Sequence, residues 1–358
     1  MVDFEALESI DELLFEFGKV ILPLYHIEPI NEAEQKELFL KGEIKNPNFK
    51  YKNIEYDSDE LRKNVESIEI PDSPFSEMYR KKQKSLLLED KIVVNRGDED
   101  IVRSATVKMH GLPSQETIIY ADEILRTLPR KEAPKIVPSD VIKESLETAL
   151  LENGLDGWSV EYSDKKLTTV IASKKKITIC KHREFAEMDS ERLKVHEVGV
   201  HTIRAANGYM QPLKIFATGF PGYLSTEEGL TTYFEEITGN SSDEILRDYA
   251  SRVIAVDSVL NGLNFINTFE RLKEYGYSDD KAWDLSLRAY RGGGYIKDHI
   301  YLEGYSKVKE FAANNGDFRT LYVGKVGIED ISLMKSLLTE GIIEDAKHLP
   351  YFLKNKTQ

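Results

Sequence analysis

The sequence is almost free of cysteine. Among its 358 residues there is a single cysteine, Cys180, so a disulfide within the chain is impossible. A zinc site built from several cysteine thiolates is excluded for the same reason. Cys180 ends the apolar stretch 176–180, and we interpret it as a small core residue rather than a nucleophile. This cysteine usage favours a reducing compartment, and we expect a cytoplasmic protein.

Long apolar runs are also missing. A helix that crosses a membrane needs about 20 consecutive apolar residues, and no stretch of the sequence approaches that length. The first 25 residues are acidic and amphipathic. They lack the positive start and the small-residue cleavage site that are typical of a secretory signal. We therefore expect neither a membrane partner nor secretion.

Basic residues are too few to balance the acidic ones. The chain has 48 lysines and arginines against 62 aspartates and glutamates, for a net charge of −14. This balance argues against nucleic acid as a partner, because nucleic-acid binding needs a basic surface. It also disfavours strongly acidic protein partners. The 41% hydrophobic and 31% charged content is that of an ordinary globular protein.

The first part of the chain reads as mostly helical. Helical periodicity runs over residues 3–24, 32–43, 74–91 and 114–127. A stretch with three prolines, 128–138, then indicates a boundary. We predict a helical N-terminal region, 1–132, that packs on a second domain, 133–358.

The second domain combines a small sheet with many helices. Three short segments rich in β-branched and aromatic residues, 157–163, 167–173 and 176–182, predict a small antiparallel sheet. Helical patterns occupy 138–152, 189–207, 225–238, 242–262, 265–275, 278–289 and 299–314. The predicted fold class is α+β, predominantly helical.

Two histidines and a glutamate lie together on the predicted helix 189–207. His196 is followed directly by Glu197, and His201 comes five residues after His196. Imidazole is a good zinc ligand, and a carboxylate beside the metal can take a proton from water. Five residues on a straight helix leave the two rings about 140° apart, which is poor for one metal. A wide π-type turn, eased by Gly199, would bring them together, so we predict an irregular backbone at 196–201.

Other interpretations of these residues stay open. The two histidines could be unrelated residues of an ordinary helix, although histidine is scarce, at 7 of 358 residues. A third ligand should come from 224–231, where Glu227 and Glu228 are the candidates. Ser225 and Glu228 also fit a capping box, which needs no metal, and by local pattern alone this is the stronger interpretation.

The combination of these motifs resembles a known family. His-Glu-Val-Gly-Val-His at 196–201, Arg204, Asn207-Gly208 and Glu-Glu-Gly-Leu-Thr at 227–231 are similar to motifs of the microtubule-associated tyrosine carboxypeptidases, whose bacterial members are named for Gln-Glu-Gly-Leu-Ala. The resemblance implies a zincin-like catalytic domain, 133–358, with a His-Glu-x-x-x-His helix. It implies that one zinc ion is held by His196, His201 and Glu228, with Glu197 as general base. Glu227 replaces the glutamine of the motif.

Two flanking segments extend the resemblance, 46–51 and 288–304. The second has cations and a tyrosine beside three glycines. A carboxypeptidase needs a cation for the terminal carboxylate of its substrate, and Arg288, Arg291 and Lys297 are the candidates. Tyr301 is the candidate donor to the oxyanion. An equally weighted alternative is a set of salt bridges around a loop that ends a helix.

The expected activity is that of a zinc-dependent metallocarboxypeptidase acting on the C-terminus of a peptide or protein, with tyrosine or another aromatic residue as a candidate for removal. Tubulin as a substrate is not supported, because its acidic tail would be repelled by an acidic chain. The alternative is a zinc-binding regulatory or interaction protein that hydrolyses nothing. An endopeptidase is a third option.

Overall fold

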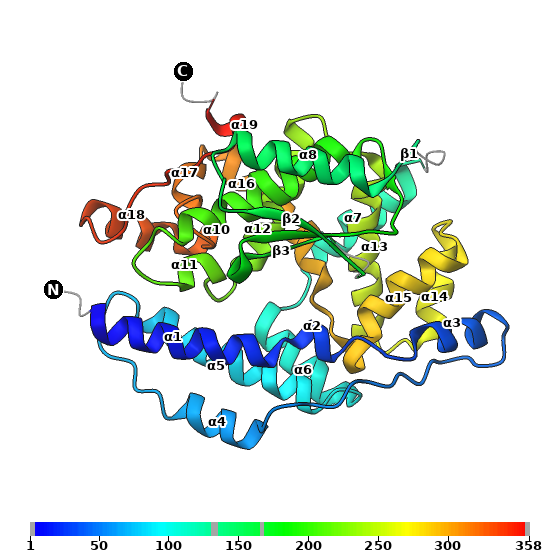
Figure 1. The fold of residues 1–358 in the computed structure, drawn as a ribbon. Helices are drawn as coiled ribbons and strands as arrows, with labels where there is room; N and C mark the ends of the chain where they lie inside the picture. Colours follow the sequence, from blue (N-terminus) through cyan, green and yellow to red (C-terminus); the bar gives the residue numbers. More distant parts are fainter. Residues whose placement is uncertain (1–3, 130–134, 165–167, 355–358) are drawn as a thin grey trace. The chain divides into compact units, whose positions relative to one another are not determined.

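The computed structural model describes residues 4–129, 135–164 and 168–354 (Figure 1). The chain forms two compact units, each assembled from separate stretches. Unit 1 consists of Met1–Asp11, Arg130–Ser242 and Gly304–Gln358, and unit 2 consists of Glu12–Pro129 and Asp243–Glu303. The division at residue 132 that we drew from the sequence stays a prediction. The predicted fold class is confirmed, since helices dominate and the sheet is small.

Unit 2 is helical. Its elements are α2 (Pro23–His26), α3 (Glu32–Leu40), α4 (Ser58–Glu66), α5 (Ser76–Val94), α6 (Glu99–His110), α7 (Gln115–Thr127), α13 (Asp243–Leu260), α14 (Phe265–Glu274) and α15 (Asp279–Gly294). Helix α1 (Phe4–Ile21) contributes residues to both units. Side-chain caps begin several of these helices, as where Asp98 accepts the Ile101 N–H at 3.0 Å. Within the described residues, none of the helices has the length and apolar character needed to cross a membrane.

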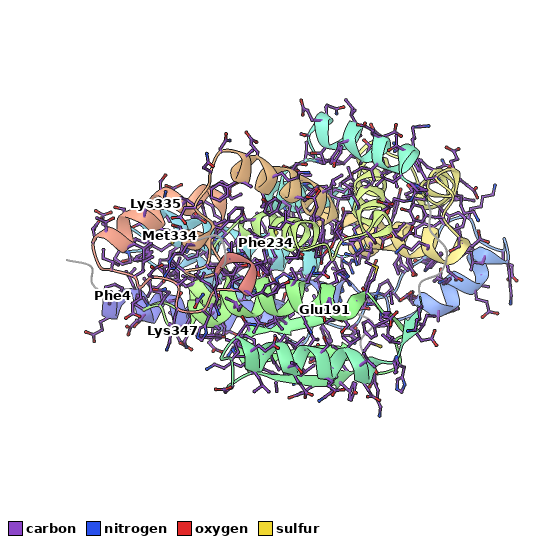
Figure 2. All side chains as sticks on the ribbon, turned by 90° about the horizontal axis from the view of Figure 1, so that it is seen from above. Phe4, Glu191, Phe234, Met334, Lys335 and Lys347 are labelled. Atoms are coloured by element: carbon purple, nitrogen blue, oxygen red, sulfur yellow. The ribbon has the colours of Figure 1, made fainter. Side chains whose placement is uncertain are left out.

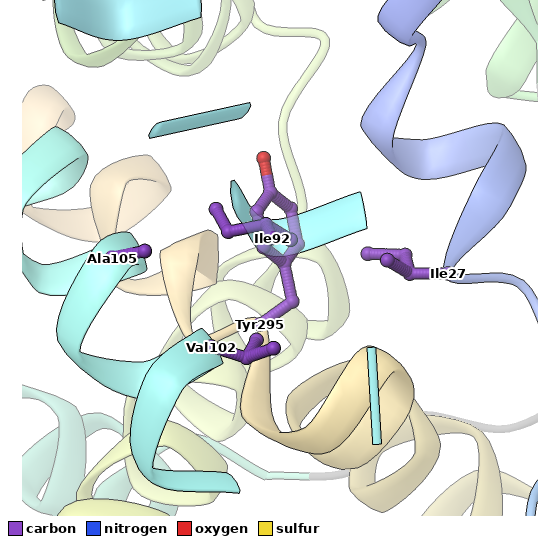
Figure 3. Packing of buried hydrophobic residues seen from close by; sticks show 5 residues of the cluster. All are labelled: Ile27, Ile92, Val102, Ala105 and Tyr295. Atoms are coloured by element: carbon purple, nitrogen blue, oxygen red, sulfur yellow. The ribbon is translucent and has the colours of Figure 1, made fainter. Parts of the chain in front are cut away.

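Apolar residues from distant parts of the sequence form the core of unit 2. One cluster joins Ile27 and Ile92 to Val102, Ala105 and Tyr295, all at most 5% exposed (Figure 3). These residues come from the segment after α2, from α5 and α6, and from the end of α15. Their burial ties the beginning of unit 2 to its last segment.

Unit 1 surrounds a small sheet with helices. Its helices are α8 (Ser139–Glu152), α9 (Asp189–Leu193), α10 (Ile203–Gly208), α11 (Ile215–Thr218), α12 (Tyr223–Ile237), most of α16 (Ile300–Ala313), α17 (Phe318–Leu321), α18 (Ile331–Thr339) and α19 (Tyr351–Lys354). Helix α18 shows the usual two-sided pattern, because Met334 is buried and its neighbour Lys335 is exposed; Figure 2 labels both. Phe234 of α12, also labelled there, is fully buried.

The sheet differs from the predicted antiparallel one. Strands β2 (Ser159–Ser163), β3 (Thr169–Ile171) and β4 (Lys176–Cys180) form a three-stranded sheet in the order β2-β4-β3. Strand β3 is antiparallel to β4, but β2 is parallel to β4, with Val160 opposite Ile177. The prediction was therefore wrong about β2. The reason is burial: β4 carries the fully buried Ile177 and Ile179 and takes the central position, which separates β2 from β3. A separate antiparallel pair joins β1 (Ile136–Val137) and β5 (Phe185–Ala186).

Helix α12 is packed tightly on both sides within unit 1. It contacts the segment 194–202 on one side. On the other side Gly229 faces Gly304 of α16, and a Cβ on either glycine would collide with the backbone of the opposite helix. The two glycines therefore allow the helices to touch through their main chains. This contact fixes the position of α12, which carries the Glu-Glu-Gly-Leu-Thr segment.

Candidate metal centre

The two histidines lie on a π-helix. The backbone from Lys194 to Thr202 is a π-helix, between α9 and α10. The irregular backbone expected at 196–201 is therefore present, and it is longer than the single wide turn that the spacing required. Its wider turn places residues five apart on one side, and the ring centroids of His196 and His201 are 4.9 Å apart. The hydroxyl of Thr202 donates to the carbonyl of Glu197 at 2.7 Å within the same segment.

Gly199 has a different role from the one expected. We expected its backbone freedom to ease the wide turn, but its φ is outside the left-handed region. Instead, an added Cβ would lie only 3.0 Å from the ring of Phe352. The Gly199 carbonyl also accepts the hydroxyl hydrogen of Tyr322 at 2.9 Å. An aromatic ring therefore packs directly on the π-helix at this glycine, and a larger residue there would be tightly packed against it.

Glu228 joins the two histidines. Ligand atoms of His196, His201 and Glu228 all lie within 4.8 Å of one another, a group that could hold a metal ion. The capping-box interpretation of Ser225 and Glu228 is wrong, because α12 begins earlier, at Tyr223, with Gly222 as its N-cap. Glu228 therefore lies in the body of the helix, where its side chain is free to face the histidines.

His196 is oriented by a buried carboxylate of α12, the helix that also carries Glu228. Its Nδ1 lies 2.7 Å from Oε1 of Glu235, whose side chain is 0% exposed. A carboxylate only accepts, so Nδ1 carries the hydrogen and Nε2 is left with a free lone pair. Arg192 reaches the same oxygen of Glu235 at 3.3 Å. The other oxygen, Oε2, is buried and has no hydrogen-bond partner among the described residues.

His201 is oriented by a second carboxylate, which belongs to an ionic network. Its Nδ1 lies 2.8 Å from Oε1 of Glu227. The ammonium group of Lys325 is 2.9 Å from the same oxygen, and Arg204 donates to Oε2. Arg204 also donates to the carbonyl of Leu321 at 3.0 Å. Glu227, the residue in place of the motif's glutamine, thus has a cation on each oxygen.

The charges of this network determine its protonation. Burial alone would raise the pKa of Glu227, but Lys325 and Arg204 outweigh it and hold the pKa well below its usual range. Burial likewise acts to lower the pKa of Lys325, and the facing carboxylate of Glu227 raises it instead. For His196 burial also acts downward, and the hydrogen bond and charge of Glu235 leave its pKa raised. Glu227 and Lys325 therefore favour each other's charged form, beside the guanidinium of Arg204.

Within the described part of the chain, the carboxylate of Glu197 has no cation or hydrogen-bond donor as a partner. Its side chain is 4% exposed, and within the described ranges it makes no hydrogen bond or ion pair. A buried carboxylate without a structural partner is costly, so such a group points to a functional site. Its position in the chain, directly after His196, is the one expected of a proton acceptor beside a metal.

Two of the predicted substrate-binding residues meet in unit 2. Arg288 donates from Nε to Asp298 at 2.6 Å, and Lys297 lies 3.4 Å from the other oxygen of Asp298. Burial acts against the charge of Asp298, but Arg288, Lys297, Arg291 and Arg252 outweigh it and strongly lower its pKa. The ion pairs that we weighed as an alternative are therefore present. Asp298 therefore lies among four cations.

Arg291 and Tyr301 lie close to the same group. Arg291 has a buried Nε without a hydrogen-bond partner among the described residues, and burial lowers its pKa. The ring of Tyr301 stacks on Tyr249, with centroids 5.3 Å apart, and the guanidinium of Arg252 lies 4.5 Å from its centroid. Lys297 is 5.3 Å from the same ring. Arg252 was missed from the sequence because it lies on α13, far from the segment 288–304.

The three glycines after Arg291 serve packing within unit 2. An added Cβ on Gly292 would lie 2.9 Å from Ile27, and one on Gly294 would lie 2.9 Å from Arg103. The Gly292 N–H also donates to the hydroxyl of Tyr51 at 3.0 Å. The two flanking segments of the family resemblance, 46–51 and 288–304, are therefore in direct contact.

Sequence reasoning missed the partners of the histidines. Glu235 could have been found, because it follows Glu228 by seven residues, about two helical turns, and so lies on the same face of α12. We considered Glu227 only as a ligand. No local signal marks Lys325, which is brought to Glu227 by the tertiary fold.

The chain is similar to known proteins over much of its length. A family model described as microtubule-associated tyrosine carboxypeptidase matches residues 36–358. Microtubule-associated tyrosine carboxypeptidase 1 of Rattus norvegicus is 27% identical over 172 residues, 45% of this chain and 35% of that protein. MATCAP2 of Mus musculus, named as a candidate tyrosine carboxypeptidase, is 26% identical over 175 residues, 46% of this chain and 32% of that protein. The chain thus spans about a third of the length of these curated relatives. No solved structure matches.

Proposed function

The chain belongs to the microtubule-associated tyrosine carboxypeptidase family, and from this membership we propose that it is a zinc-dependent carboxypeptidase with a zincin-like catalytic unit. Its substrates would be the C-termini of peptides or proteins. The observation that carries the proposal is the grouping of His196, His201 and Glu228, with ligand atoms within 4.8 Å of one another.

The chemistry of this group suits zinc. Two imidazoles and one carboxylate are a known ligand set of catalytic zinc, in which a fourth position stays open. Both imidazoles have Nδ1 engaged by a carboxylate, at 2.7 and 2.8 Å, so each has Nε2 available for a metal. His196, His201 and Glu228 would hold the ion. When bound, zinc supplies the Lewis acidity that makes water a nucleophile near neutral pH.

The side chains around the metal would handle the protons. Glu197 would accept a proton from the attacking water and then pass it to the leaving amine. Its lack of a structural partner in the described part of the chain supports this role over a purely structural metal site, which needs no base. Tyr301 is our candidate for donating a hydrogen bond to the oxyanion.

The cations of unit 2 would bind the terminal carboxylate of the substrate. Arg288, Arg291 and Lys297 are the candidates, and we rank Arg291 first because its buried Nε has no hydrogen-bond partner among the described residues. We propose tyrosine or another aromatic residue as the one removed, by analogy with the names of the relatives.

The proposal is tested by incubating the zinc-loaded protein with a peptide library and identifying the products by mass spectrometry. We expect loss of single C-terminal residues, with Glu197→Gln inactive although it still binds zinc. An Arg291→Gln variant should raise KM far more for free C-termini than for amidated ones. Cleavage within peptides would instead indicate an endopeptidase. No cleavage by folded, zinc-bound protein would favour a zinc-binding regulatory protein.

A further inference from the structure

The two histidines of the candidate zinc site are held by carboxylates in very different surroundings. We propose that Glu235 is a positioning residue that sets the zinc affinity through His196, whereas Glu227 acts mainly on the stability of the fold. This inference rests on the proposed zinc site. It concerns residues for which the sequence motif gives no such role.

Glu235 is placed to act on the metal and on little else. Its side chain is 0% exposed, and its Oε1 accepts from His196 at 2.7 Å. Among the described residues its cationic partner is Arg192, which is at 3.3 Å and has a shorter pair of its own with Asp189, at 2.8 Å. The charge of Glu235 is therefore balanced only weakly, and it is directed at the histidine.

Helix α12 connects Glu235 with the third ligand. Glu228 and Glu235 are seven residues apart, about two turns, so one face of the helix supplies a ligand and also orients another. A carboxylate on Nδ1 fixes the ring and the tautomer of a metal-binding histidine and makes it a stronger ligand. Loss of such a partner typically costs 10- to 100-fold in metal affinity.

Glu227 differs because its charge is required elsewhere. It is 1% exposed and lies between Lys325, at 2.9 Å, and the fully buried Arg204. Removing its charge would leave two buried cations without a counter-ion, which destabilises a fold strongly. The variants Glu235→Gln and Glu227→Gln make the same chemical change. We therefore expect the first to lower mainly the zinc affinity and the second to lower mainly the stability of the fold.

The test compares metal-free stability with zinc affinity in the full chain. Zinc dissociation constants are measured by competition with a chromophoric chelator, and Tm is measured without metal. We expect Glu235→Ala to lose about 10- to 100-fold in zinc affinity and Glu235→Gln, which keeps the acceptor, to lose less. Glu227→Gln should show the larger fall in metal-free Tm. The matched control is Glu236→Ala, since Glu236 is 44% exposed and its ion pair within the described part of the chain is with Lys309.

A second readout reports the geometry of the site. The visible spectrum of the cobalt-substituted protein should change in Glu235→Ala and stay unchanged in Glu236→Ala. The inference is overturned if Glu235→Ala binds zinc as tightly as the wild type does. If that variant does not fold, Glu235→Gln decides, and unchanged affinity and spectrum in it overturn the inference. If the wild type itself binds no zinc, the proposed function fails and this inference fails with it.

Discussion

Replacement of Gly229 by alanine tests whether main-chain contact between α12 and α16 holds the metal site in place. An added Cβ would collide with the carbonyl group of Gly304 and lie 2.9 Å from the nitrogen of Tyr305. An ordinary contact needs at least 3.4 Å, so that nitrogen must move by at least 0.5 Å (3.4 − 2.9), and the carbonyl group by more. Backbone atoms cannot be relieved by a rotamer change, so the helices must separate.

Two effects of opposite sign decide the outcome. Alanine is favoured over glycine within a helix by about 1 kcal/mol. Overpacking typically costs about 1–3 kcal/mol, and the upper end applies here because both partners are main chain. We therefore expect Gly229→Ala to lower the free energy of unfolding by about 2 kcal/mol. Glu228 is the adjacent residue and must move with the helix, and metal–ligand distances tolerate only about 0.2 Å, so zinc affinity should fall as well.

Urea unfolding of the metal-free protein and a zinc competition assay measure the two effects. Gly18→Ala is the matched control, because a Cβ there would lie 3.7 Å from Leu86, an ordinary contact in helix α1. That variant should be as stable as the wild type or more stable, with the same zinc affinity. A Gly229→Ala protein that gains stability, as helix propensity alone predicts, would refute the reasoning.

Two further predictions concern the pH dependence of stability and the effect of zinc on stability. Burial lowers the pKa of His110 to about 3, so between that value and about 6.5 the unfolded chain binds more protons and stability falls as pH falls. From pH 6.5 to 5 this histidine should account for about 1–2 kcal/mol of the loss. Urea unfolding of His110→Gln should show a correspondingly shallower pH dependence, and equal slopes would contradict the assignment. Zinc at about 1,000 times its Kd should raise the free energy of unfolding by about 4 kcal/mol. Calorimetry should show that a chelator reverses this gain and that Glu228→Ala lacks it.

Local patterns in the sequence were enough to predict most of the helices. Segments such as 114–127 and 299–314 correspond to α7 and α16 within one residue at each end. Helix α4 was missed because Ser58–Glu66 contains only two apolar residues, Leu61 and Val65, too few to show a period. The parallel pairing of β2 could not be predicted, because strand order depends on which strand the rest of unit 1 buries.

The residues of the candidate site were likewise only partly predictable from the sequence. His196, Glu197 and His201 are adjacent in sequence, and their spacing alone required a wide turn. Glu228 was chosen through the family motif, since its local pattern favoured a cap. Glu235 could have been found from its spacing to Glu228, but the pairing of Lys325 with Glu227 is a contact over a long sequence distance, which no pattern within a helix predicts.

The stretches that build unit 1 also set the order in which its metal site can be completed during synthesis. His196, His201 and Glu228 leave the ribosome while the segment from Gly304 onward does not yet exist. That last segment supplies the glycine that faces α12, the lysine at Glu227 and the ring against Gly199. A chain interrupted after Glu303 has every candidate ligand but none of these supports. If the proposed zinc site is correct, firm binding would require the segment from Gly304 onward, and products truncated before it would lack this capacity.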